Sequence, residues 1–150
     1  MAAVPIRQQV LSAFESAISV ELAALTPAVP VESQRREEVI TFPSVLIIDG
    51  DEGEPEEGIG IVKRFALVRA EGYVQAATQA VLRNARENLQ AHVIHAIASD
   101  YTLGGWAVNA THTRTDTLTI MHSAQPSTAF SLDFEIEYWT KPGDPFTLGP

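Results

Sequence analysis

Cysteine is absent from the 150-residue chain, which excludes disulfides, thiolate metal sites and cysteine nucleophiles. Positive charge is scarce: 10 Lys and Arg stand against 19 Asp and Glu, for a formal net charge of -9. This balance argues against binding to a nucleic-acid phosphate backbone, although an acidic surface would still let DNA pass by without binding. No apolar run approaches the ~18 residues of a transmembrane helix, and MAAVPIRQQV lacks the apolar core of a signal peptide. We therefore expect a protein made in the cytoplasm and used there, or carried out as part of a larger particle.

What the chain does contain is enough apolar sequence for a core. Apolar residues make up 45% of it, which excludes wholesale disorder. A chain of this length buries roughly two-thirds of its unfolded surface. We expect one domain over residues 1–150, with no internal repeat.

Apolar periodicity predicts two helices. The first runs from Val4 to about Leu25 and is ended by Pro27 and Pro30, which begin an extended linker. Its stripe consists of Val10, Leu11, Phe14, Ile18, Leu22 and Leu25. The second is expected from Tyr73 to about Ala98. Its face consists of Val74, Val81, Leu82, Ala85, Leu89, Val93 and Ile97.

Four strands are expected between and after these helices. Two of them, residues 39–48 and 59–70, flank an acidic segment and predict a hairpin. After a turn at Gly104 and Gly105, residues 106–122 carry alternating Thr that would form one polar face. Residues 130–139 alternate most regularly, with apolar side chains opposite Asp133, Glu135 and Glu137. The order helix-β-β-helix-β-β predicts an α+β domain, with a mainly antiparallel sheet and two helices packed on one face.

The acidic segment DGDEGEPEEG, residues 49–58, raises the question of a metal site. Its carboxylates are Asp49, Asp51, Glu52, Glu54, Glu56 and Glu57. Gly53, Glu54 and Gly60 occupy positions 5, 6 and 12 of a would-be EF-hand loop, where an acid, Gly and Glu are required. We expect a mobile, solvated hairpin loop, and we expect replacement of all six acids by Ser and Asn to leave the monomer fold intact.

The sequence gives little support for other catalytic or metal-binding sites. His92 and His95 are three apart and do not form HExxH, and His112 and His122 are expected at opposite ends of a long strand or hairpin. No nucleophile elbow, dinucleotide fingerprint or P-loop is present. Asp133 and Glu135 share a strand face at a spacing compatible with glycoside hydrolysis, but an outward polar face produces the same pattern. Lys63, Arg64, Arg69 or Arg114 could neutralise that row across the sheet. We assign no catalytic residue, metal or cofactor.

Two segments resemble a known family. FSLDFEIEYWTKPGDPF, residues 130–146, resembles the ending of tail terminator proteins of long-tailed phages, the family represented by the minor tail protein U of phage lambda. The matching residues there are Tyr138, Thr140, Gly143, Asp144 and Pro145. YTLGGWA, residues 101–107, resembles the family's turn between second helix and third strand. Upstream, an N-terminal helix, VITFPSVLIIDGDEGE and a central helix follow the family's order, so the resemblance covers nearly the whole chain. The acidity of 49–58 departs from the family, and in the implied assembly the segment would either hang over a neighbouring subunit or face the channel or the tube.

The resemblance implies a non-enzymatic virion protein at the junction of tail and neck, assembled in the host cytoplasm. It implies a six-membered ring that caps the tail tube, stops its polymerisation and provides the docking surface for the head connector or stopper protein. DNA passes through the lumen without specific binding. Three alternatives stay open: a head-completion or neck adaptor protein, a small hydrolase using Asp133 and Glu135, and a free-standing binding domain. The source could be a phage, a prophage or a gene transfer agent, with a contractile or a non-contractile tail.

The candidate site residues are therefore interface residues. They comprise the six acids of 49–58, the basic side chains on the paired strand, and the segment from Trp139 to Phe146. The set is Asp49, Asp51, Glu52, Glu54, Glu56, Glu57, Lys63, Arg64, Arg69, Trp139, Asp144 and Phe146. Trp139 is equally compatible with an ordinary core position.

Overall fold

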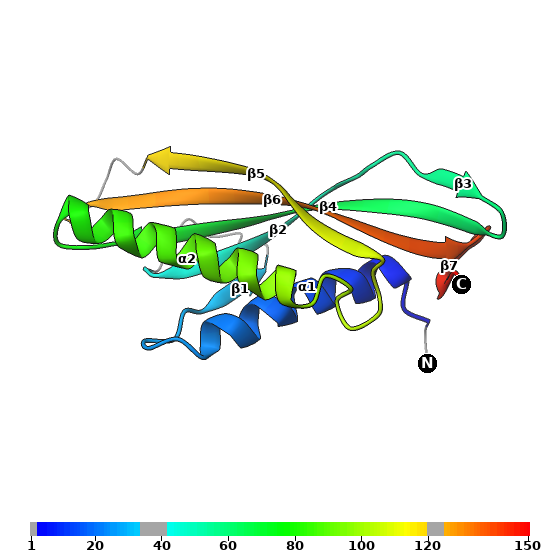
Figure 1. The fold of residues 1–150 in the computed structure, drawn as a ribbon, viewed down its shortest axis with the longest axis horizontal. Coiled ribbons are helices and arrows are strands. Elements are labelled where there is room, and N and C mark those ends of the chain that lie inside the picture. Colours follow the sequence, from blue (N-terminus) through cyan, green and yellow to red (C-terminus); the bar gives the residue numbers. More distant parts are fainter. Residues whose placement is uncertain (1–2, 34–41, 120–124) are drawn as a thin grey trace.

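The computed structural model describes residues 3–33, 42–119 and 125–150, and contains two helices and seven strands within them (Figure 1). The elements are α1 (Ile6–Ala23), β1 (Val31–Ser33), β2 (Ser44–Glu52), β3 (Glu56–Gly58), β4 (Ile61–Gln75), α2 (Gln79–Ser99), β5 (Asn109–Thr119), β6 (Ser127–Lys141) and β7 (Asp144–Leu148).

All seven strands belong to one sheet, whose order is β1-β2-β4-β6-β5. β3 pairs with β4, and β7 pairs with β6. Every pairing is antiparallel except that of β1 with β2. Both helices lie on the same side of the sheet (Figure 1). The predicted α+β class, with its helices on one face, is confirmed.

The core lies between the helices and one face of the two longest strands. The even-numbered residues of β6 from Phe130 to Tyr138 are buried, as the alternation predicted. The α1 stripe packs against them, and the rings of Phe14 and Phe134 meet edge to face with centroids 5.2 Å apart. Leu11 and Leu25, at the margins of the predicted stripe, are only partly buried.

The boundary between β4 and α2 corrects the sequence prediction. Residues 73–75 continue β4 rather than opening the helix, and Tyr73 pairs with Ala129 on β6. Val74 is buried in the strand, so it does not belong to the helix face. The helix begins after Thr78, whose side-chain oxygen accepts a hydrogen bond from the Val81 amide at 3.3 Å. This N-cap satisfies an amide that has no partner inside the helix, and it fixes the start six residues later than expected.

The acidic segment is mainly strand, which corrects the expected loop. Asp49 to Glu52 form the end of β2, and Glu56 to Gly58 form β3. The reversal of the chain falls at Ile59 and Gly60 instead, and Gly60 has φ of +74°. Only glycine adopts this left-handed conformation readily, so the tight turn is located where the sequence has Gly60.

The threonine row does not form a single polar face. The pairing of β5 with β6 shifts between His112 and Arg114, where a β-bulge inserts one extra residue. Thr111 therefore lies opposite Glu135 on the helix-free face, whereas Thr115 and Thr117 lie opposite Leu132 and Phe130. One inserted residue moves every later side chain to the other face of a strand.

Several boundaries differ from the predicted ones. The strand expected at 39–48 begins at Ser44, and its first residues, 39–41, lie outside the described part of the chain, as does His122. The expected linker after α1 contains the short strand β1, which pairs in parallel with β2. β1 has only three residues, too few for alternation to be recognised in the sequence.

Candidate assembly surfaces

The β3–β4 hairpin projects at one end of the molecule, where β3 lies beyond the helices (Figure 1). We call residues 51–60, which contain β3 and its turn, the acidic arm. Ile59 at its tip is fully exposed. Asp51, Glu54, Glu56 and Glu57 are exposed as well. Within the described residues none of these four carboxylates forms an ion pair, so the arm is an acidic projection with an apolar tip.

The other two acids of the segment are structural. The Arg7 guanidinium on α1 donates to Asp49, with Nη1 3.1 Å from Oδ2, and its Nε lies 2.7 Å from Oε1 of Glu52. The hydrogen bond to Asp49 is the main cause of the raised pKa of Arg7. The Tyr138 hydroxyl donates to Glu52 at 2.6 Å, and burial together with that carboxylate raises the Tyr138 pKa. Asp49 and Glu52 thus tie the end of β2 to α1 and β6.

The three basic candidates on β4 have different partners. Lys63 lies over the Trp139 ring, 5.7 Å from its centroid, on the helix-free face. Arg64 lies on the helix side, where its Nε donates to Thr140 Oγ1 at 3.0 Å. Arg69 pairs with Asp133 at 2.8 Å, and this hydrogen bond raises the Arg69 pKa. Of the cations expected to neutralise the acidic row, Arg69 reaches Asp133, whereas Arg114 pairs with Asp116 on its own strand.

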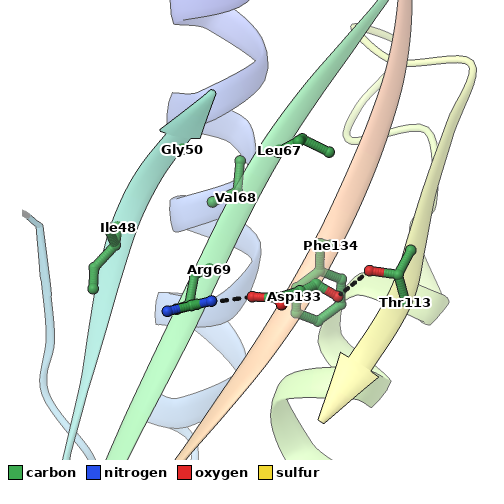
Figure 2. A pocket seen from close by; sticks show the side chains of 8 residues that line it. All are labelled: Ile48, Gly50, Leu67, Val68, Arg69, Thr113, Asp133 and Phe134. Atoms are coloured by element: carbon green, nitrogen blue, oxygen red, sulfur yellow. Dashed lines mark hydrogen bonds and ion pairs between the residues drawn. The ribbon is translucent and has the colours of Figure 1, made fainter. Parts of the chain in front are cut away.

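The helix-free face carries a shallow hollow of about 400 Å³ across β2, β4, β6 and β5. Figure 2 shows the side chains of Ile48 on β2 and Leu67 on β4, and the ion pair that joins Arg69 on β4 to Asp133 on β6. The Thr113 hydroxyl, displaced by the bulge, donates to the backbone oxygen of Asp133 at 3.2 Å. Asp133 lines the hollow and is paired with Arg69, whereas Glu135 does not line it.

The C-terminal segment folds back on β6 as β7. Asp144 accepts hydrogen bonds from Thr147 Oγ1 at 2.6 Å and from the Phe146 amide at 3.0 Å, and these bonds lower its pKa. Asp144 therefore stabilises the start of β7, directly after the turn at Pro142 and Gly143, where Gly143 has φ of +71°. Trp139 is half-buried and donates to Glu137 at 2.7 Å, whereas Phe146 is 47% exposed. Phe146 is thus the apolar side chain of this segment that is left for a partner.

The turn after α2 is stabilised by Asp100. Its carboxylate accepts from Thr102 Oγ1 and from the Gly104 amide, both at 2.8 Å, and these bonds lower the Asp100 pKa. Leu103, Gly104 and Gly105 all have positive φ, and Leu103 is buried. YTLGGWA is therefore a defined, left-handed turn that anchors itself in the core through Leu103.

A polar cluster that the sequence did not reveal joins the two helices. Glu21 Oε1 on α1 lies 3.1 Å from Nδ1 of both His92 and His95 on α2. Ser99 Oγ lies 3.3 Å from His95 Nε2, but its hydroxyl donates to the His95 backbone oxygen at 2.7 Å. The serine proton is thus directed away from the imidazole. The partners are about seventy residues apart, so no local pattern could have paired them.

We expect Glu21→Gln to weaken the α1–α2 contact in a pH-dependent way. The hydrogen bond to His92 chiefly lowers the Glu21 pKa below its ordinary value of 4.5. A lowered pKa adds stability above the ordinary value and loses it as the pH falls through the folded one. Unfolding by urea should show Glu21→Gln less stable by up to about 1 kcal/mol at pH 6, with the difference shrinking as the pH falls below 4.5 and through the lowered pKa. A difference that persists in acid would contradict this.

The described ranges 3–33, 42–119 and 125–150 contain no group of three or more His, Asp or Glu arranged to hold a metal ion. None of the helices in this part of the chain is long and apolar enough to cross a membrane.

Comparison with solved structures finds a similarity in the course of the chain. No protein-family model matches the sequence. No curated protein matches it either. Among solved structures, the chain is similar to a chain of the virion of a native gene transfer agent (GTA) particle, with a TM-score of 0.46 and 12% identity. The similarity covers 85% of this chain and 96% of that chain. A likeness of this size does not by itself assign a function.

Proposed function

We propose that this chain is a structural protein of a phage-like virion, and specifically the tail terminator. In this role it forms a homo-hexameric ring that caps the tail tube, stops polymerisation and presents a docking surface to the head connector or stopper protein. The observation that carries the proposal is the resemblance of residues 130–146 and 101–107 to that family. The first segment forms β6, a tight turn and β7, and the second forms the turn before β5.

Several features of the surface support an assembly role. The hairpin arm projects with a fully exposed Ile59, and Phe146 is exposed near the chain end. β5 is the terminal strand of the sheet, so in the described chain one of its edges has no strand beside it. Different patches on one chain generate head-to-tail contacts, which close into a ring when the rotation between neighbouring copies permits. A formal charge of -9 on each protomer would make a ring through which DNA slides without adhering.

The proposed role is non-enzymatic and needs no cofactor. The candidate interface comprises the acidic arm, the basic residues Lys63, Arg64 and Arg69, and the segment from Trp139 to Phe146. Asp49 and Glu52 are part of this candidate interface because they lie at the base of the arm. Their bonds to Arg7 and Tyr138 fix where the arm leaves the rest of the domain. The protein would act in the virion, at the junction of tail and neck, after assembly in the host cytoplasm.

Deletion of the gene tests this role directly. We expect electron microscopy to show overlong tail tubes beside unattached, filled heads, because tube growth lacks its terminator. A copy of the wild-type gene supplied in trans should restore tail length. Tails of normal length beside leaking or tailless heads would instead assign the protein to the head side of the neck. Entirely normal particles would remove the chain from virion assembly.

A further inference from the structure

We propose that the acidic arm of one protomer docks on the amino-terminal end of α2 in a second copy of the chain. The receiving surface, the α2 end patch, consists of Ala80, Val81, Arg83 and Arg86. This contact rests on the proposed ring function, and it specifies which two surfaces of neighbouring copies meet in the ring.

The arm combines an exposed apolar tip with exposed acidic side chains. Ile59 has a relative exposure of 104%, so within the described chain it packs against nothing. A fully exposed Ile at the tip of a projecting hairpin gains apolar burial only from a partner. Around it stand the exposed acids Glu54, Glu56 and Glu57. The partner must therefore offer an apolar contact beside positive charge.

The α2 end patch has this chemistry. Val81, in the first turn, is 55% exposed, and Ala80 beside it is exposed too. Arg83 follows Ala80 by three residues and Arg86 follows Arg83 by three, so each lies beside the previous one on the helix surface. Neither arginine forms an ion pair or hydrogen bond with a described residue. By contrast, Arg7, Arg69 and Arg114 are all ion-paired.

The backbone of α2 adds to this charge. The first turn of the helix contains no acidic side chain, so the positive end of the helix dipole is not neutralised from within the helix. The Thr78 side chain accepts a hydrogen bond from only one amide of this turn, that of Val81. Carboxylates arriving from another chain would interact favourably with both the two arginines and this end of the helix.

The two surfaces cannot meet within one protomer. The β3 hairpin and the first turns of α2 lie at opposite ends of the long axis (Figure 1). β4 joins them, since it starts at the arm and ends four residues before α2. Complementary patches at opposite ends of one chain produce a heterologous, head-to-tail contact, which closes into a ring when its rotation permits. A second copy of this chain is therefore the partner that the charges and the placement fit.

Charge reversal tests the pairing by sedimentation equilibrium at low ionic strength. We expect Arg83→Glu with Arg86→Glu, or Glu56→Lys with Glu57→Lys, to raise the dissociation constant of self-association by roughly tenfold or more. Combining all four substitutions should recover most of the loss, because opposite charges face each other again. Association equal to wild type in both reversed variants, or no recovery in the combined variant, would overturn the inference.

A cross-link provides a second measurement without changing the charges. The chain has no native cysteine, so Ile59→Cys with Ala80→Cys should give intermolecular disulfides under mild oxidation. Ile59→Cys with Val20→Cys is the matched control, since Val20 is 71% exposed on α1, outside the patch. Cross-linking equal to the control, or a wild-type protein that stays monomeric at every concentration, would also overturn it.

The two proposals fail separately. Normal tails after gene deletion would remove the terminator role even if the cross-link forms. Overlong tails together with an absent cross-link would keep the terminator role and remove this contact.

Discussion

Gly72→Ala is expected to lower the free energy of unfolding by about 3 kcal/mol, although it adds a single methyl group. A Cβ on Gly72 would lie 2.1 Å from Cζ and 2.3 Å from Cε1 of Phe130. The two residues are directly paired across β4 and β6, and Phe130 has no exposed surface. Its ring therefore cannot turn away into solvent. Thermal or urea unfolding followed by circular dichroism measures the loss.

The same pair offers an internal control. The φ of Gly72 does not lie in the left-handed region, so alanine fits the backbone and the cost comes from the ring alone. Phe130→Leu removes most of the obstructing ring and should cost less in the Gly72→Ala background than in the wild type. We expect a coupling of at least about 1 kcal/mol between the two changes. Additive effects would show that the ring is not the cause.

Arg7→Met is expected to destabilise the protein by about 1–2 kcal/mol. The change leaves the carboxylates of Asp49 and Glu52 near each other without their shared cation. The side chains of all three residues are less than a third exposed, so solvent screens this repulsion only in part. Urea unfolding at pH 7 measures the difference.

The matched control for Arg7→Met is Glu56→Gln with Glu57→Gln, which removes two acids of the same segment. Both are exposed and unpaired within the described chain, so stability should change by less than about 0.5 kcal/mol. If both variants lowered the free energy of unfolding equally, the distinction between the paired acids, Asp49 and Glu52, and the unpaired acids of the segment would be wrong. The expectation that all six acids can be replaced without loss of stability thus narrows to the four exposed, unpaired acids, Asp51, Glu54, Glu56 and Glu57.

Local periodicity made the helix–sheet arrangement predictable. The alternation in β6 and the apolar stripe in α1 are patterns among residues that are close in sequence. Local patterns of this kind predicted both helices and the four main strands. The stretch from Tyr73 to Gln75 has apolar spacing compatible with a strand or a helix. The Thr78 cap and the pairing with β6 decide between the two, and only the structure shows the pairing.

The interactions that divide the acidic segment were beyond sequence reasoning for a physical reason. Arg7 and Asp49 are 42 residues apart, and Tyr138 and Glu52 are 86 apart. A run of acids looks uniform in sequence, whereas the fold places some against α1 and leaves others on the arm. The β-bulge at His112–Arg114 is similar, since nothing in alternating Thr shows where one extra residue enters.

The length and direction of β4 and β6 have a mechanical consequence. Each strand has 15 residues, or about 50 Å of extended chain, and they are paired along fourteen consecutive positions, from Val62–Thr140 to Gln75–Ser127. Their inter-strand hydrogen bonds run perpendicular to the strands. A pull along the strands therefore loads the whole ladder in shear at once, instead of opening it bond by bond from one end. The paired strands should therefore make the protomer resist extension between its two ends.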